Sequence, residues 1–369
     1  MRMIEIQENG LCLRFGVTGK GRLLLLAVTD TEQTVRAEEE MEEAVLAEYV
    51  PVEAVLTGEN CPEDRLGNQM VHTSLGMRLG FREYEKIRKE EGSLYVFHLE
   101  DEEQGVNVRL YYQFYDGLRT FTCYTEVQNE GDEIQGLEAV SSFSLHGFDR
   151  PDTEPYEERY RLHLVHNGWQ KELGWKSYRL SELGLTASQA AGRYNSSKII
   201  SITNTGAWST KEYLPLGILE DRKEGSCLTW QIEHNGSWHW EIGEHAGMLY
   251  LKAAGPTQLY AHWYKELNTQ DRFVSVPVSV SFTRGGADAA VRELTKYRRR
   301  IRRQNEDNEK MPVIFNDYMN CLWGRPTTEE ELPLIDMAAS CGCEYYCIDC
   351  GWYSAGEWWG NVGEWLPSE

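Results

Sequence analysis

The sequence predicts a chain of two parts, a large antiparallel β-sandwich followed by the start of a parallel α/β domain. In residues 1–285, apolar and polar residues alternate in many short runs, which is the pattern of half-buried strands. Residues 286–310 change to a helical period and then to a polar stretch, and residues 311–369 contain a strand–helix–strand pattern. A chain of 369 residues is also long enough for two domains. We therefore expect a sandwich domain, a linker and an α/β domain with these boundaries.

The clearest strands lie in the first part. Residues 106–114 alternate, and Asp116-Gly117 turns the chain into a second run at 121–127, so this segment predicts a hairpin. Few helical windows interrupt the other alternating runs. Many strands joined by short turns favour a large antiparallel sandwich.

Two further features of the first part predict how its strands pair. Asn235-Gly236 lies between two tryptophan-containing runs and predicts a second hairpin. Residues 274–282 alternate strictly, and Pro277 lies within them. Because proline has no N–H to donate, it favours a strand at the edge of a sheet.

A helix is predicted after the sandwich. Apolar residues recur at helical spacing over residues 287–301, and the opposite face is basic. The basic residues are Arg298, Arg299, Arg300, Arg302 and Arg303. Such a face would suit an RNA contact, but in an acidic protein a solvated linker helix is the better interpretation.

The last part has the pattern of a parallel α/β crossover. Residues 313–315 form a short apolar run without alternation, as expected of a strand buried on both faces. Thr327 or Thr328 caps a helix that ends near Gly342, and residues 345–348 form the next buried strand. A group directly after this strand lies where α/β enzymes place their binding residues.

The composition narrows the range of expected binding partners and of cellular compartments. The net charge of −22 repels phosphate backbones and anionic lipids, so neither nucleic acid nor a membrane is an expected partner. The first residues lack the apolar region of a secretory signal, and no run approaches the roughly 20 apolar residues of a membrane span. We therefore expect a cytoplasmic protein.

The cysteines indicate neither disulfides nor a metal site. Nine cysteines, an odd number, fit reduced thiols in a chain without an export signal. Five of them lie close to the end of the sequence, at positions 321, 341, 343, 347 and 350. Their spacing differs from the paired ligands of structural zinc sites, so small core residues are the favoured interpretation and no metal is predicted.

The two predicted strand ends of the last part carry residues suited to sugar recognition. Asn316 and Asp317 follow the first strand, and Asp349, Cys350 and Trp352 follow the second. A carboxylate accepts hydrogen bonds from sugar hydroxyls, and an indole packs on the apolar face of a pyranose. The alternative is that Asp349 only caps a loop or a helix, and the residues alone leave both interpretations open.

The segment from Pro312 to Ser368 resembles the entry to the catalytic barrel of glycoside hydrolase family 36, the α-galactosidases. The matching residues, in order, are Asn316, Asp349 with Gly351-Trp352, and Gly363-Glu364-Trp365, with looser matches at 166–174 and 201–219. The resemblance implies an N-terminal β-supersandwich, then a (β/α)8 barrel of which this chain holds only the first strand, helix and second strand. It also implies homo-oligomers and no metal or organic cofactor.

The resemblance further implies retaining hydrolysis by two aspartates on later barrel strands. No catalytic residue is therefore assigned in this chain, and the 369 residues alone are expected to be inactive. The expected sugar-binding residues are Asn316, Asp317, Asp349, Cys350, Trp352 and Trp365. Cys350 stands where the family has a second aspartate, and losing such a charged hydrogen bond costs roughly 1.5–3 kcal/mol. The predicted substrate is thus an α-galactoside or an α-N-acetylgalactosaminide, and the alternative function is a non-catalytic carbohydrate-binding or oligomerisation module.

Overall fold

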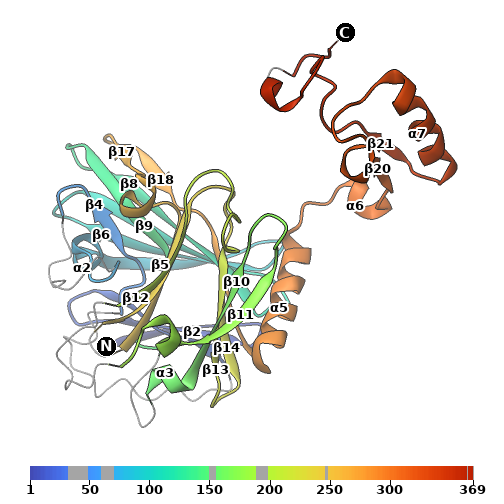
Figure 1. Cartoon of the computed structure of the whole chain (residues 1–369). Helices are drawn as coiled ribbons and strands as arrows, with labels where there is room; N and C mark the ends of the chain where they lie inside the picture. The colour runs from blue at the N-terminus through green and yellow to red at the C-terminus, as the bar shows by residue number, and fades with distance from the viewer. Residues whose placement is uncertain are drawn as a thin grey trace. The chain divides into compact units, whose positions relative to one another are not determined.

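The computed structural model describes residues 1–31, 49–59, 70–148, 155–187, 198–245, 248–363 and 365–368. These residues form two compact units, Met1–Arg300 and Ile301–Glu369 (Figure 1). The first unit consists mainly of antiparallel sheets, and the second contains a parallel strand pair joined by a helix. The predicted fold class, antiparallel β followed by α/β, is confirmed.

The largest sheet of the first unit has ten strands. They are β5 (Gly80–Arg88), β6 (Ser93–Asp101), β7 (Val106–Phe114), β8 (Thr120–Asn129), β10 (Tyr160–His166), β11 (Gly174–Arg179), β13 (Leu216–Asp221), β14 (Ser226–Ile232), β18 (Arg272–Val274) and β19 (Val278–Arg284). Their order is β11-β10-β13-β14-β19-β8-β7-β6-β5, with β18 beside β8.

Two smaller antiparallel sheets contain the other strands that the structure describes in this unit. The six-stranded sheet contains β4 (Ala54–Leu56), β9 (Gln135–His146), β12 (Ile199–Asn204), β15 (Trp238–His245), β16 (Met248–Ala254) and β17 (Lys265–Leu267). Its order is β12-β15-β16-β9-β17, with β4 beside β9. The three-stranded sheet contains β1 (Arg2–Glu8), β2 (Leu11–Val17) and β3 (Leu23–Asp30). The helical segments are α2 (Ser74–Arg78), α3 (Tyr156–Arg159), η3 (Leu180–Leu183), α4 (Gln258–Ala261) and α5 (Gly286–Ile301).

One hydrophobic core draws side chains from all three sheets. Phe15 on β2, Phe97 on β6 and Leu251 on β16 belong to it and are fully buried. Strict alternation of buried and partly buried residues along β7 supplies one wall of this core. The hairpin predicted between residues 106 and 127 is confirmed, with Tyr112 opposite Cys123.

The hairpin predicted at Asn235-Gly236 is wrong. Strand β14, before it, pairs with β13 and β19, whereas β15, after it, pairs with β12 and β16 in the other sheet. The chain therefore crosses from one sheet to the other at this turn. Trp230 and Trp240 are both fully buried and meet between the sheets, with ring centroids 5.0 Å apart. Strands β14 and β15 thus contact each other through their indole side chains across the core. They do not form the backbone hydrogen bonds of a hairpin with a two-residue turn.

The edge position predicted from Pro277 is also wrong. Residues 275–277 break the alternating run into β18 and β19, and β19 lies inside the ten-stranded sheet between β14 and β8. Pro277 lies in this break, where its missing N–H removes no ladder hydrogen bond. Its carbonyl accepts a hydrogen bond from the Glu233 N–H at 2.9 Å.

Helix α5 packs on the first unit through one face, while its arginine-rich face is exposed. Ala290, Leu294 and Tyr297 are buried, and the Tyr297 ring lies 5.4 Å from that of Tyr115. The compact first unit extends to Arg300, so it includes nearly all of the helix that the sequence pattern places in a linker. Within the described ranges, no helix is both long enough and apolar enough to span a bilayer.

The second unit contains the predicted strand–helix–strand arrangement. Its elements are α6 (Glu306–Lys310), β20 (Ile314–Asn316), the π-helical turn η4 (Tyr318–Leu322), α7 (Thr328–Ser340), β21 (Tyr345–Cys347) and η5 (Trp359–Asn361). Strands β20 and β21 are parallel, with Phe315 opposite Tyr346. Thr327 caps α7 by accepting a hydrogen bond from the Glu330 N–H at 3.3 Å.

The two parallel strands are not buried on both faces, which corrects the prediction. Ile314 is 59% exposed and Tyr345 is 56% exposed. In the part of the chain that the structure describes, each strand pairs only with the other. Burial on both faces requires flanking strands and helices on each side of the sheet.

Candidate functional site

The predicted site residues lie where the two parallel strands end. Asn316 is the last residue of β20, and Asp349 follows the last residue of β21 by two positions. In the register of the pair, Asn316 lies opposite Cys347. Because the strands run in the same direction, their C-terminal ends meet at one edge, which is where α/β enzymes bind ligands.

Hydrogen bonds join three of the predicted residues. Asn316 Nδ2 donates to Asp349 Oδ2 at 2.8 Å, and the Asp349 N–H donates to Asp317 Oδ1 at 2.8 Å. Asn316 Oδ1 accepts from the Tyr318 N–H at 2.9 Å, which fixes the orientation of the amide. Asn316 and Asp349 are exposed, whereas Asp317 is buried. The exposed carboxylate of Asp349 is therefore held in a defined orientation.

Asp317 adjoins an acidic residue of helix α7. Glu331 is buried, and its Oε2 accepts a hydrogen bond from the Tyr346 hydroxyl at 2.5 Å. Burial and the adjoining Asp317 carboxyl raise the pKa of Glu331. Burial and the hydrogen bond to Glu331 likewise raise the pKa of Tyr346. Two acidic side chains thus meet in one buried position beneath the strand ends.

Cys350 lies next to Asp349 and packs into the adjoining loop. It is 8% exposed, and burial together with the Asp349 carboxylate raises its pKa to about 11. A Cβ added at Gly324 would lie 2.9 Å from the Cys350 sulfur, so the thiol rests close to the Gly324 backbone. Gly351 has a φ of +91°, and a Cβ there would lie 2.1 Å from the Gly324 carbonyl oxygen. Glycine is required at position 351 for both reasons.

The predicted tryptophans form an aromatic cluster. The ring centroids of Trp352 and Trp365 are 6.3 Å apart, and Tyr353 lies 5.2 Å from the first and 5.0 Å from the second. The indole of Trp365 is exposed. Glu364, which belongs to the same sequence motif, lies outside the described residues.

The strand ends therefore bring together Asn316, Asp317, Asp349 and Cys350, while the tryptophans cluster in the loop that follows. Sequence reasoning missed Glu331 and Tyr346. Glu331 is one of three consecutive glutamates in the first turn of α7, a pattern typical of exposed acids that favour a helix N-terminus. Only the contact of α7 with the strand ends distinguishes it from its neighbours.

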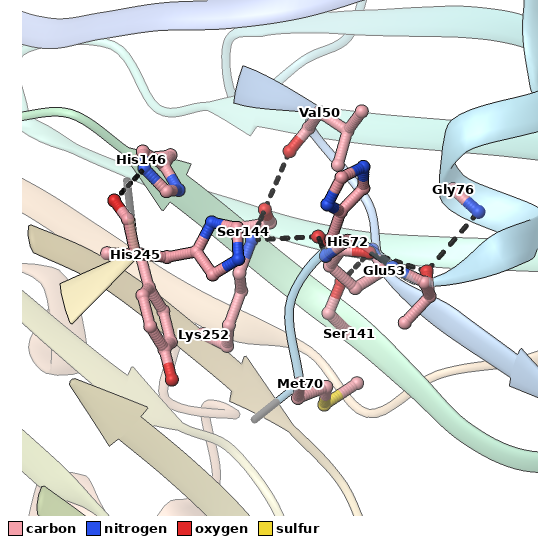
Figure 2. Close-up of polar contacts among 12 residues, drawn as sticks. Val50, Glu53, Met70, His72, Gly76, Ser141, Ser144, His146, His245 and Lys252 are labelled. Atoms are coloured by element: carbon pink, nitrogen blue, oxygen red, sulfur yellow. Dashed lines mark hydrogen bonds and ion pairs between the residues drawn. The ribbon is translucent and has the colours of Figure 1, made fainter. Parts of the chain in front are cut away.

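A second buried polar cluster lies in the first unit, around the six-stranded sheet (Figure 2). Lys252 on β16 is fully buried, and its Nζ donates to Ser144 Oγ at 2.5 Å and lies 3.4 Å from Glu53 Oε1. Glu53 also accepts hydrogen bonds from the His72 N–H at 2.8 Å and the Thr73 N–H at 2.9 Å. These bonds fasten the segments around β4 and α2 to the sheet.

Histidines extend this cluster without forming a metal site. His146 is fully buried, and its Nε2 lies 3.2 Å from the His245 carbonyl oxygen (Figure 2). Burial, and then the charge of Lys252, lower the pKa of His146, which keeps the imidazole neutral. Among the residues that the structure describes, no three histidines, cysteines or acids are grouped to hold a metal ion. The cluster is suited to holding the fold together.

Neither a family model nor a curated relative matches this sequence, but solved structures match its fold. The α-galactosidase AgaB of family 36 from Geobacillus stearothermophilus has a TM-score of 0.73 at 13% identity, over 100% of this chain and 53% of that chain. The α-galactosidase from Lactobacillus brevis has a TM-score of 0.72 at 12% identity, over 95% and 49%. A variant of AgaA from Geobacillus stearothermophilus in complex with stachyose has a TM-score of 0.74 at 14% identity, over 96% and 50%.

These likenesses concern the fold. The chain has the architecture of the N-terminal part of family 36 α-galactosidases, and it spans about half the length of the structures it matches. The similarity covers both units, because at least 95% of this chain is aligned in each case.

Proposed function

We propose that this chain is the N-terminal part of a retaining α-galactosidase-like glycoside hydrolase, and that its strand-end cluster binds hydroxyls of an α-galactoside. The observation that carries the proposal is the Asn316–Asp349 hydrogen bond of 2.8 Å. It fixes an exposed carboxylate at the C-terminal edge of two parallel strands, and such a carboxylate accepts hydrogen bonds from sugar hydroxyls. The fold shared with α-galactosidases supports this class of sugar.

In the proposed enzyme, the chemistry belongs to other carboxylates. Retaining hydrolysis requires a nucleophile and an acid/base whose carboxyl groups lie about 5–5.5 Å apart. Asp349 is held by Asn316, and Asp317 is buried and holds the Asp349 main chain, so both are assigned to positioning and binding. The proposal places the catalytic pair on barrel strands outside these 369 residues.

Cys350 bears on which sugar is bound. A thiol is a weak hydrogen-bonding group compared with a carboxylate, so a second strong acceptor beside Asp349 is missing. Variants of AgaA have been crystallised with raffinose and with stachyose. We therefore choose raffinose as the first ligand to test, with an α-N-acetylgalactosaminide as the rival.

Isothermal titration calorimetry of raffinose and of methyl α-N-acetylgalactosaminide tests binding. Asp349→Ala should weaken the affinity at least tenfold, because hydrogen bonds to a charged group contribute roughly 1.5–3 kcal/mol. Asp336→Ala, an exposed aspartate on α7, is the matched control and should bind like the unmodified chain. If neither sugar binds, the proposed site is wrong.

Hydrolysis of the nitrophenyl α-galactoside and its N-acetyl analogue tests the enzyme assignment. The 369-residue chain should show no turnover, and a form extended at the C-terminus should be active. Turnover by the 369-residue chain would contradict the proposed location of the catalytic pair. Sugar binding without turnover in both forms would instead favour a carbohydrate-binding module.

A further inference from the structure

Asp317 and Glu331 form a buried acidic pair beneath the proposed sugar site. They come from the end of β20 and the first turn of α7, and they are 1% and 6% exposed. One oxygen of each is engaged, since Asp317 Oδ1 accepts the Asp349 N–H at 2.8 Å and Glu331 Oε2 accepts the Tyr346 hydroxyl at 2.5 Å. The other two oxygens, Asp317 Oδ2 and Glu331 Oε1, are buried and receive no donor from the described residues.

Two ionised carboxylates in this position would repel each other. The titratable groups that act on Glu331 are Tyr346, Asp317 and Glu330, and none of these is a cation. A buried carboxylate needs either donors with a counter-charge or a proton. A single proton between Asp317 Oδ2 and Glu331 Oε1 supplies the missing donor and removes one negative charge, as in other paired carboxyls that share a site.

We propose that Asp317 and Glu331 are positioning residues that share one proton, and that this protonated pair holds the Asp349 main chain at the end of β21. The protonated oxygen of one acid donates to the free oxygen of the other. Asp317 is thereby fixed, and its Oδ1 keeps the hydrogen bond from the Asp349 N–H. When the shared proton leaves, the two charges separate and Asp317 releases Asp349. The link to sugar binding rests on the proposed function, whereas the shared proton does not.

The surroundings of the pair fix the direction of its pH response. The titratable groups that interact with the pair are Tyr346, Glu330 and Cys350, and Cys321 and Asp349 interact in turn with Tyr346 and Cys350. Burial raises the pKa of Glu331, the Tyr346 hydroxyl lowers it, and Asp317 raises it again, so that the net change is upward. The folded chain therefore keeps a proton that the unfolded chain releases. The stabilisation is complete below the unfolded pKa and is lost as the pH rises through the folded pKa.

Carboxyl-carbon NMR of the 369-residue chain, labelled at aspartate and glutamate, tests the shared proton directly. We expect one carboxyl titration above the ordinary range, belonging to the pair as a unit. Asp317→Asn and Glu331→Gln should each abolish it, because an amide supplies the missing donor permanently. Glu329→Gln, an exposed glutamate in the same turn, is the matched control and should leave the raised titration unchanged.

Tyr346→Phe separates a shared proton from a merely structural contact. Its hydroxyl favours ionised Glu331, so its removal should shift the raised titration further upward. Raffinose affinity should fall as the pH rises through this titration and should lose that pH dependence in Glu331→Gln.

Two outcomes distinguish this proposal from the proposed function. A raised titration without raffinose binding would support the shared proton and count only against the sugar site. The proposal is overturned if both carboxyls titrate in their ordinary range, or if each titrates independently of the other's substitution.

Discussion

Both units bury acidic side chains, but they neutralise them in different ways. In the first unit, Glu53 is surrounded by donors and lies 3.4 Å from the Nζ of the fully buried Lys252. In the second unit, Asp317 and Glu331 adjoin each other, and no cation is among the described groups that shift the pKa of Glu331. A buried carboxyl group can be stabilised by donors and a nearby cation, as at Glu53, or by a proton, as proposed for Asp317 and Glu331. The cluster around Glu53 is therefore architectural, whereas the protonation state of the Asp317–Glu331 pair depends on pH.

The largest expected effect comes from removing the cation of the architectural cluster. Lys252→Met should lower the free energy of unfolding of the first unit by about 3–5 kcal/mol, because Glu53 is left buried without its counter-charge. Urea denaturation followed by tryptophan fluorescence measures this loss. Adding Glu53→Gln should restore part of the stability, since the substitution removes the uncompensated charge.

An exposed ion pair of the same unit provides the control. Lys211 lies 3.5 Å from Glu212, and both side chains are largely exposed. Lys211→Met should change the free energy of unfolding by less than about 0.5 kcal/mol. Equal losses from Lys252→Met and Lys211→Met would remove the distinction between the buried cluster and a surface pair.

An effect of intermediate size is expected on the alkylation rate of Cys350, which lies at the acidic strand ends. Burial and the Asp349 carboxylate raise the pKa of Cys350 to about 11, so its reactive thiolate is scarce at pH 8. Cys350 should therefore react with iodoacetamide at least tenfold more slowly than the exposed Cys341, and its rate should rise as the pH approaches 11. Mass spectrometry of tryptic peptides measures both rates.

Asp349→Asn sharpens this test, because it removes a negative charge beside the thiol. Alkylation of Cys350 at pH 9 should then accelerate, whereas Cys227 should remain unreactive. Burial and Glu220 raise the pKa of Cys227 to about 12, and Cys227 is fully buried in the first unit. An unchanged rate at Cys350 would show that burial alone governs its reactivity.

The smallest expected effect concerns the helix that presents Glu331. Thr327 accepts the Glu330 N–H at 3.3 Å, and Thr327→Ala should destabilise α7 by about 1 kcal/mol. Hydrogen exchange of the α7 amides measures the loss. Thr328→Ala, inside the helix, should cost less, and equal effects would mean that the cap does not position this turn.

Local sequence patterns were sufficient to predict much of the secondary structure of the second unit. The capping threonine, the helix and the two strands were predicted because each depends on neighbouring residues. The placement of Asn316 and Asp349 at adjoining strand ends followed from parallel pairing alone. The partnership of Asp317 with Glu331 was not predictable, because three consecutive glutamates look alike until α7 packs on the strand ends.

In the first unit, the sequence by itself determined the β character and several of the strands, and only the tertiary structure decided how the strands pair, where the run at 274–282 breaks and what covers each strand. Alternation predicted β14 and β15, but they belong to different sheets, since a turn does not specify which edge the next strand joins. Lys252 is the one charged residue of β16, which is otherwise apolar or aromatic, and a lysine is usually exposed to solvent. It is fully buried because segments distant in sequence cover that face and place Glu53 beside it.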